Sequence, residues 1–348
     1  MGGIFGGSLP DTGGESATPP TGDGEFITLP LTEQEEKRLA QLTTEPVIGA
    51  VIKPDENKVM YFKLGEGKLH EITYNGEGGE TQLSRITIKD IIDVRWSHKK
   101  TYALITTLEG GGTKHMWLKR TGTSSVETGA VNGALMSTAF SPAADTLASI
   151  TKTTSSYALR TSNPDGTKAK TIFSTPIADF ELYWITNQLL ALKTRTSGLA
   201  PSLLQTLPAG GGDSTVLVSG IYGFDAVFSP DGETFIGSKT TESGANIALA
   251  LYKRRDASLQ KALTFKTLPE KCVFSKKELS TIYCAIPRTL GTEALPDAWW
   301  QGRVNFEDTL WKINTETDET TTLLEGGGFD ITSIIVSPNE EYLFFINK

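Results

Sequence analysis

Short apolar runs alternate with polar residues along most of this chain, and many of them occur in pairs around a tight turn. The clearest pair is FDAVFSPDGETFIG at 224–237, where the turn contains Pro230, Asp231 and Gly232. Proline pre-sets φ for a turn and glycine permits positive φ, so this stretch predicts a β-hairpin.

Degenerate copies of this hairpin recur along the sequence. Aligned on Ser229, the copies sit at Lys53, Ser97, Ser141, Ile185, Ser229, Ser275 and Ser337, and the first five positions are 44 residues apart. Each full repeat carries four strand-like runs, from an innermost strand A to an outer strand D, such as STAFS, TLASITK, SYALRTS and AKTIFS in the third. Four antiparallel strands with their turns match the period of a propeller blade.

One four-stranded blade cannot bury both of its faces, so the blades must pack against one another in a closed ring. The sequence therefore predicts an all-β, seven-bladed β-propeller, with six or eight blades as alternatives. The expected blades lie near 46–90, 91–134, 135–178, 179–223, 224–270, 271–328 and, for the shared last blade, 329–348 plus 26–45.

The last repeat holds only strands A and B, so its outer strands must come from the N-terminal part of the single domain, residues 26–348. We expect an outer strand at 38–43, with 26–30 as a candidate for the third strand. Thr32 and Glu35 have capping-box spacing, and a short helix over 33–41 is the competing interpretation. With the strand at 38–43, residues 32–37 form a turn or one helical turn.

Residues 1–25 are rich in Gly, Pro, Ser and Thr and predict a disordered linker. A linker at the start of a chain has nothing to link, which suggests an upstream anchor or signal and a membrane-anchored full-length protein. The chain itself has no apolar stretch near 18 residues. Its net charge of −8 argues against nucleic acid as a partner.

The two cysteines, Cys272 and Cys284, flank one predicted hairpin turn. If Ser275 pairs with Thr281, the cysteines face each other on paired strands, at the spacing that a disulfide needs. A disulfide predicts an oxidising, extracytoplasmic location, such as the periplasm or the cell surface. The alternative is a pair of buried thiols in a cytosolic protein.

The hairpin Phe-Ser-Pro-Asp-Gly followed by an apolar run, repeated at this spacing, resembles the TolB-type, WD-repeat-like β-propellers of bacterial envelope proteins. The resemblance covers about residues 38–348, although the Gly-His and Trp-Asp pairs of true WD repeats are absent. It implies the propeller fold and a cell-envelope protein. It implies no activity, because propellers host many functions.

The sixth repeat is irregular, because Ser275 and Ser337 are 62 residues apart. The additional residues, RTLGTEALPDAWWQGRVNFE at 288–307, lie between strands B and C, on the face that most propellers use for ligands. The predicted binding residues are Trp299, Trp300, Asp297, Arg303 and Phe306. Aromatic rings beside polar groups suit a protein hot spot or carbohydrate stacking. The alternative is that the tryptophans anchor the loop by packing.

The rest of the sequence offers little catalytic chemistry. The three histidines are not placed to converge, and no nucleophile elbow, P-loop or zinc motif occurs, so we predict no catalytic residues, no metal and no cofactor. The expected function is a non-catalytic extracytoplasmic binding or assembly module, monomeric, with a protein or glycan partner. The alternative is a glycoside hydrolase or lyase that uses carboxylates, for which the candidates are Asp225, Asp297, Glu307, Asp308 and Asp330.

Overall fold

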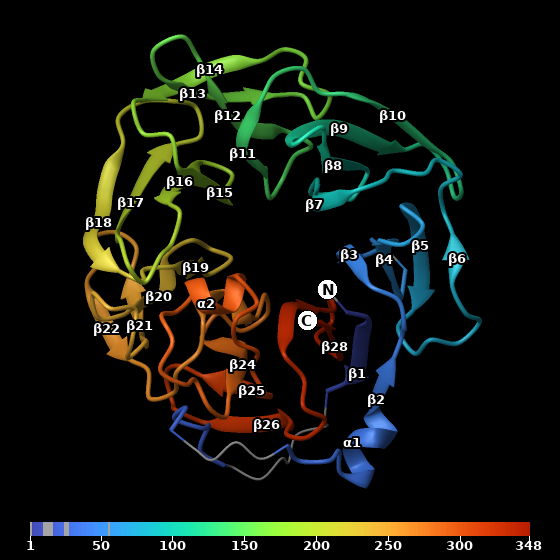
Figure 1. Cartoon of the computed structure of the whole chain (residues 1–348), viewed down its shortest axis with the longest axis vertical. Helices are drawn as coiled ribbons and strands as arrows, with labels where there is room; N and C mark the ends of the chain where they lie inside the picture. The colour runs from blue at the N-terminus through green and yellow to red at the C-terminus, as the bar shows by residue number, and fades with distance from the viewer. Residues whose placement is uncertain (1, 10–16, 24–27, 55) are drawn as a thin grey trace. The chain divides into compact units, whose positions relative to one another are not determined.

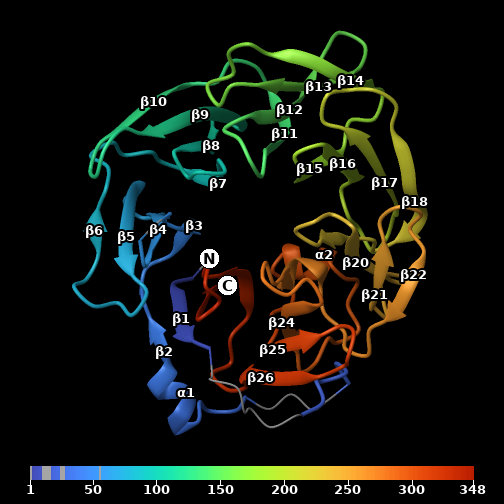
Figure 2. The ribbon, with the colours of Figure 1, turned by 180° about the vertical axis from the view of Figure 1, so that it is seen from behind.

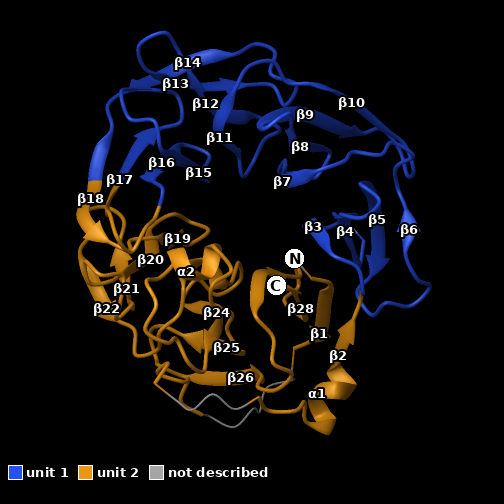
Figure 3. Ribbon diagram, viewed as in Figure 1, with its two compact units in different colours: residues 1, 43–195, 204–216 blue, residues 2–42, 196–203, 217–348 orange. Residues whose placement is uncertain are grey.

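The chain is a seven-bladed β-propeller, in agreement with the period of its repeats: it forms seven antiparallel sheets of four strands each. The computed structural model describes residues 2–9, 17–23, 28–54 and 56–348. These residues divide into two compact units (Figure 3). Unit 1 comprises 43–195 and 204–216, and unit 2 comprises 2–42, 196–203 and 217–348.

Unit 1 contains the first three blades. Blade 1 consists of β3 (Val47–Ile52), β4 (Lys58–Lys63), β5 (Lys68–Thr73) and β6 (Thr81–Gln82). Blade 2 consists of β7 (Ile91–Trp96), β8 (Tyr102–Glu109), β9 (Gly112–Arg120) and β10 (Val126–Ala130). Blade 3 consists of β11 (Leu135–Phe140), β12 (Leu147–Lys152), β13 (Tyr157–Ser162) and β14 (Lys170–Thr175).

The boundary between the units falls within blade 4, which consists of β15 (Phe180–Thr186), β16 (Leu189–Thr194), β17 (Pro201–Pro208) and β18 (Thr215–Tyr222). Unit 2 contains blade 5, with β19 (Ala226–Phe228), β20 (Thr234–Lys239), β21 (Ala248–Lys253) and β22 (Leu259–Ala262). Blade 6 follows, with the 3-10 helix η1 (Pro269–Lys271), β23 (Cys272–Phe274), β24 (Thr281–Pro287), the helix α2 (Asp297–Trp300), β25 (Asp308–Asn314) and β26 (Thr320–Leu324).

Blade 7 is shared between the two ends of the chain, as predicted, in the order β2-β1-β28-β27. The C-terminus supplies β27 (Ile331–Val336) and β28 (Tyr342–Asn347), and the N-terminus supplies β1 (Ile4–Ser8) and β2 (Leu39–Gln41). Figures 1 and 2 show β1 beside β28 from both sides of the molecule, and the register pairs Phe5 with Phe345.

The third strand of blade 7 corrects the prediction for the N-terminus. Residues 1–25 were expected to be a linker, but Ile4–Ser8 forms β1 between β28 and β2. Of the alternative segment 26–30, residues 28–30 are not in a strand and 26–27 lie outside the described residues. The physical reason is close packing: a Cβ at Gly6 would collide with the ring of Phe344, so the glycines that suggest a linker are what fits here.

Both interpretations of the segment after Pro30 are partly correct. The helix α1 (Glu33–Arg38) begins at a complete capping box, in which the Thr32 hydroxyl accepts the Glu35 N–H and the Glu35 carboxylate accepts the Thr32 N–H. The chain then continues as the short outer strand β2, within the range predicted for a strand.

Among the described residues, no helix is long and apolar enough to cross a membrane.

The repeated turn is explained by a buried residue at the aligned position. This residue is at most 9% exposed in every blade. The hydroxyls of Ser97, Ser229 and Ser337 accept the N–H of the residue five positions later and so close the turn. Blade 1 has Lys53 instead, whose ammonium lies 2.6 Å from the buried Glu71 carboxylate. Blade 1 therefore differs from the serine copies because an ion pair takes the place of the hydroxyl.

Candidate functional site

The insertion in blade 6 leaves the sheet at the end of β24 and returns to it at β25. Arg288 N–H donates to Glu307 O at 3.0 Å, which extends the ladder by one pair before the chain departs. The only helix in the insertion is α2, a single turn that carries Asp297, Trp299 and Trp300. The five predicted binding residues are therefore held on one short segment, but their side chains point to different surroundings.

Trp299 and Phe306 pack inside unit 2. They are 5% and 3% exposed, and their rings stack with centroids 6.1 Å apart. Trp299 Nε1 lies 2.9 Å from both carboxylate oxygens of Asp330, and the Phe306 N–H donates to Asp330 Oδ2 at 3.2 Å. For these two residues the structure has the loop-anchoring arrangement that was the alternative to ligand binding.

A buried ammonium lies beneath the two rings. Lys271, at the end of η1, is completely buried and its Nζ donates to Asp308 Oδ2 at 2.6 Å, Asp330 Oδ1 at 2.8 Å and Ile331 O at 2.9 Å. The same Nζ lies 4.7 Å from the Trp299 ring centroid. All three N–H donors are used, which is what a charged group needs when it is removed from water. Composition and repeat spacing gave no indication of this lysine; its only signal is a cation directly before an apolar strand.

Asp308, at the start of β25, is the most unusual titratable group of the cluster. Its Oδ2 accepts from Lys271 and from the Ile331 N–H at 2.7 Å, whereas its buried Oδ1 has no hydrogen-bond partner among the described residues. Burial raises the pKa of Asp308 to about 6, against the opposing attraction of Lys271 and with a further contribution from Asp330. We call Lys271, Trp299, Phe306, Asp308 and Asp330 the anchor cluster.

The C-terminal residue also contacts the anchor cluster. The Lys348 ammonium lies 4.5 Å from the Trp299 ring centroid and donates to Trp299 O at 2.5 Å. Burial lowers the pKa of Lys348, with Asp330 opposing that effect. The candidate carboxylates Asp308 and Asp330 thus hold cations and backbone N–H groups of blades 6 and 7, and their arrangement fits structural anchoring better than attack on a substrate.

Asp297 attaches the insertion to a neighbouring loop of unit 2. Its carboxylate accepts from Ser197 Oγ at 2.9 Å and from the Gly198 N–H at 2.7 Å, in the loop between strands B and C of blade 4. A Cβ at Gly198 would collide with Leu295 O, so the approach requires glycine. The corresponding loop of blade 5 joins through the Leu295 N–H, which donates to Gly244 O at 2.9 Å.

Two large apolar side chains remain exposed on these braced loops. Trp300 is 40% exposed, with Nε1 donating to Glu270 at 2.6 Å, and Leu199 is 58% exposed. Arg303 lies beside them in sequence, exposed and paired with Glu293 at 2.9 Å. Of the predicted binding residues, Trp300 and Arg303 are therefore accessible, Asp297 is a brace, and Trp299 and Phe306 are internal. Leu199 was not predicted, because its loop is about 100 residues away in sequence.

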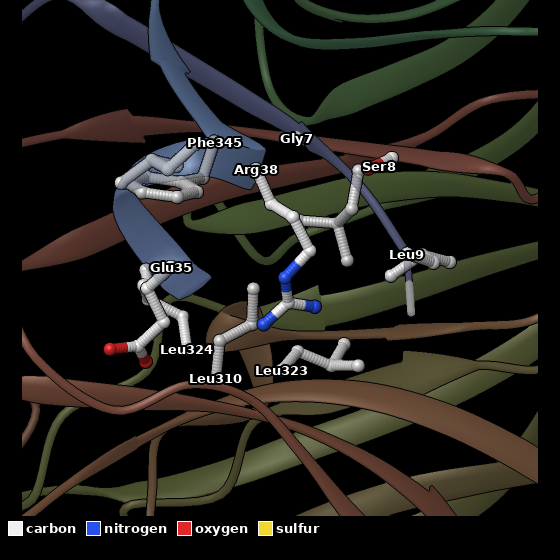
Figure 4. Close-up of a pocket in the computed structure, with 11 residues that line it drawn as sticks. Gly7, Ser8, Leu9, Glu35, Arg38, Leu310, Leu323, Leu324 and Phe345 are labelled. Carbon is white, nitrogen blue, oxygen red and sulfur yellow. The ribbon is translucent and has the colours of Figure 1, made fainter. Parts of the chain in front are cut away.

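A small cavity of unit 2 lies beside the strands that close blade 7. Figure 4 shows Glu35 and Arg38 of α1 above Leu310, Leu323 and Leu324 of blade 6. The cavity measures about 40 Å³, close to the volume of one water molecule, so it accommodates no organic ligand. Glu35 there accepts the Glu325 N–H, and this contact joins α1 to blade 6.

Among the described residues no group of three or more His, Cys, Asp or Glu could hold a metal ion.

The cysteines are joined. Cys272 and Cys284 are direct partners in the pairing of β23 with β24, and their sulfurs are bonded at 2.07 Å. The register that the sequence predicted for this hairpin, and the disulfide that followed from it, are both present. The bond ties the innermost strand of blade 6 to its neighbour, directly after Lys271.

Comparisons with known proteins place this arrangement among β-propellers. TolB from Acinetobacter baumannii matches with 15% identity and a TM-score of 0.48, over 81% of this chain and 64% of that protein. An oligogalacturonate lyase from Vibrio parahaemolyticus matches with 10% identity and a TM-score of 0.56, over 95% and 98%. An acylaminoacyl peptidase from Pyrococcus horikoshii matches with 12% identity and a TM-score of 0.53, over 84% and 47%.

TolB proteins are thus among the structural neighbours, as the resemblance of the hairpins predicted. This chain spans less than two thirds of the length of the first of them. No family model and no curated protein matches the sequence. At these identities each likeness shows the fold alone, and the neighbours include both lyases and peptidases, so the function must be argued from the site.

Proposed function

We propose that this chain is a non-catalytic binding module that acts outside the cytoplasm and docks a protein partner on the loops of unit 2. The docking face consists of Trp300, Arg303 and Glu293 of the insertion together with Leu199 of the neighbouring loop. The interaction energy of a protein interface is concentrated in a few aromatic and arginine side chains surrounded by polar groups. The exposed residues of the insertion have this composition.

The observation that carries the proposal is the bracing of exposed apolar side chains. The turn that directly precedes Trp300 is immobilised by Trp299, which hydrogen-bonds to Asp330 in the anchor cluster, and by Asp297, which accepts the Gly198 N–H. A side chain that is already fixed in place loses little conformational entropy when a partner binds. The bracing therefore has a functional use that an ordinary surface tryptophan would not have.

The location is supported by the disulfide. Disulfides persist in oxidising compartments and are rare in the cytosol of most organisms. Titration of the purified protein under denaturing, non-reducing conditions should find no free thiol, and two after reduction. Two reactive thiols in protein purified under oxidising conditions would contradict the extracytoplasmic assignment.

Partner capture tests the docking face. The immobilised chain is exposed to an envelope extract of the source organism and compared with the double variant Leu199→Ser and Trp300→Ala. The matched control is Leu259→Ser, which removes a more exposed leucine, at 62%, from the outer strand β22. We expect a protein retained by the wild type and the control and lost by the double variant.

The same preparations distinguish the catalytic alternative. Turnover of a polyuronate or another glycan that is abolished by a single change at Glu307 or Asp297 would overturn the proposal in favour of a carboxylate-dependent lyase or hydrolase. If the wild type, the double variant and the control all retain the partner equally, the proposed docking face is wrong. The chain would then still be a binding module, but the partner would bind another of its surfaces.

A further inference from the structure

Unit 1 contains an open hollow at the ends of blades 3 and 4 where strands A turn into strands B and strands C into strands D. It has a volume of about 500 Å³, within the range of small-molecule sites. Blade 3 contributes the turn between β11 and β12, and blade 4 contributes the ends of β15 and β17. The lining residues are Ser141, Ala143, Ala144, Thr146, Thr161, Trp184, Asn187, Ala209 and Gly210.

The turns that border the hollow differ from the turn of blade 5. In blade 5 the turn carries Asp231 and Glu233, and Ser229 donates a hydrogen bond to the Asp231 carboxylate. Blade 3 has alanine at the position of Asp231, namely Ala143. Blade 4 has a turn of only two residues between Thr186 and Leu189, which are paired in register.

The polar groups around the hollow are not satisfied by the protein. The hydroxyls of Thr146 and Thr161 and the amide of Asn187 make no hydrogen bond to any described residue. Trp184 is half-buried in the wall, and its Nε1 is covered without an acceptor in the described part of the chain. A covered donor without a partner costs about 1–3 kcal/mol. The hydroxyls of Thr146 and Thr161 and the amide of Asn187 belong to half-exposed or exposed residues, and they remain available to a polar ligand in the hollow.

The chemistry of the lining selects the ligand class. None of the lining residues is charged, so neither an anion nor a cation would find a counter-ion there. Threonine hydroxyls and an asparagine amide donate to and accept from hydroxyl groups, and an indole face packs against apolar C–H surface. We propose that this hollow binds one ring of a neutral saccharide, with Trp184 as its stacking surface and Thr146, Thr161 and Asn187 as its hydrogen-bonding groups.

Tryptophan fluorescence reports on this site directly. The purified protein is titrated with glucose, galactose, mannose and N-acetylglucosamine, and with galacturonate as a charged comparison. At least one neutral sugar should give a saturable change, with a Kd in the millimolar range for a single ring. The change should disappear in Trp184→Phe, because that indole is the reporter. Equal or tighter binding of galacturonate would overturn the neutral class.

A filled hollow provides the decisive variant. Ala143→Phe places a ring in the hollow, and Lys99→Phe places the same ring at the corresponding turn position of blade 2 as the matched control. We expect Ala143→Phe to raise the Kd at least tenfold and Lys99→Phe to leave it unchanged, with both proteins melting near the wild-type temperature. If Ala143→Phe melts well below the wild-type temperature, Asn187→Ala is used in its place, and we expect the same tenfold or greater rise in Kd.

No response to any neutral sugar, or an unchanged Kd in the filled variant, would overturn the proposal. Because the hollow belongs to unit 1 and the docking face to unit 2, neither result bears on the docking of a protein partner.

Discussion

Lys271 makes two ion pairs and a cation–π contact with a single buried ammonium group. It neutralises Asp308 and Asp330, which come from blades 6 and 7, and it lies beneath Trp299. A buried ion pair contributes little compared with apolar residues of the same shape, but removal of one partner leaves a charge without compensation. Removal of the Lys271 charge alone should therefore lower the free energy of unfolding strongly, although replacement of the whole ion pair by apolar residues would change it little.

We predict that Lys271→Met lowers the free energy of unfolding by about 3–5 kcal/mol. Methionine keeps most of the apolar stem, so the loss measures the charge. Urea denaturation gives the value, and Lys276→Met, at an exposed position in the same blade, is the control. A loss no greater than that of the control would show that the two carboxylates do not require the ammonium.

The second prediction at this scale concerns pH. Asp308 has a pKa of about 6 in the folded protein against 3.8 ordinarily, so between these values the folded state binds more protons than the unfolded state. Its contribution to stability is therefore fully present below the unfolded pKa and is lost as the pH rises through the folded pKa. The charged groups that face it are Lys271 and Asp330, with Lys348 beyond them.

Asp308→Asn removes this titration and provides the measurement. The wild type should gain stability relative to the variant as the pH falls from about 7 to about 4, by roughly 2–3 kcal/mol at 1.4 kcal/mol per pKa unit. The difference between the two free energies of unfolding cancels the other titrating groups. A constant difference across this range would mean that Asp308 titrates normally in the folded protein.

Among the elements, the N-terminal strands show where sequence patterns succeed and where they fail. The outer strand β2 was predicted from the place that Arg38–Thr43 holds before the first repeat. The strand β1 was missed, because IFGGS has one apolar pair and its glycines favour a linker. Glycine is required at position 6 by the Phe344 ring across the strand, and that contact joins residues 338 apart, beyond any local pattern.

We predict that Gly6→Ala destabilises the protein by about 1–3 kcal/mol, the usual cost of overpacking a core. The new methyl group meets the Phe344 ring, which is completely buried and has little freedom to move. The matched control is Gly65→Ala, at which an added Cβ contacts nothing. Thermal unfolding of the two variants compares them, and equal midpoints would mean that β1 is not packed as described.

The candidate site was predicted only in part for a similar reason. The spacing of the repeats located the insertion, and its composition identified the aromatic and charged residues. Which of two adjacent tryptophans points inward depends on Asp330 and Lys271, which are distant in sequence and belong to other elements. The hollow of unit 1 was missed because its lining comes from several turns of two neighbouring blades, and no single stretch of sequence indicates how those turns meet.

For the molecule as a whole, the two ends of the chain meet in one sheet. The Asn347 N–H donates to Gly3 O, and every residue of β1 is in register with β28. A sheet that is completed by strands from both ends protects two edges that would otherwise pair with other chains. We therefore expect folding to depend on the presence of β1 beside β28, and to depend much less on where along the chain the two termini lie.

A circular permutant separates these two factors. A short flexible linker joins Lys348 to Gly2, and new termini open between Gly110 and Gly111, in the exposed turn after β8 where added side chains would meet no neighbour. We expect this permutant to be folded and monomeric by circular dichroism and size exclusion, because exposed turns tolerate new termini. Deletion of residues 1–8 should instead lower the melting temperature and cause self-association, because β2 and β28 lose their common partner. The control is the unpermuted chain cleaved between Gly110 and Gly111. The idea that the N-terminal strand stabilises this propeller by closing blade 7 is contradicted if the deletion variant melts at the wild-type temperature. It is also contradicted if the permutant fails to fold while the cleaved control stays folded.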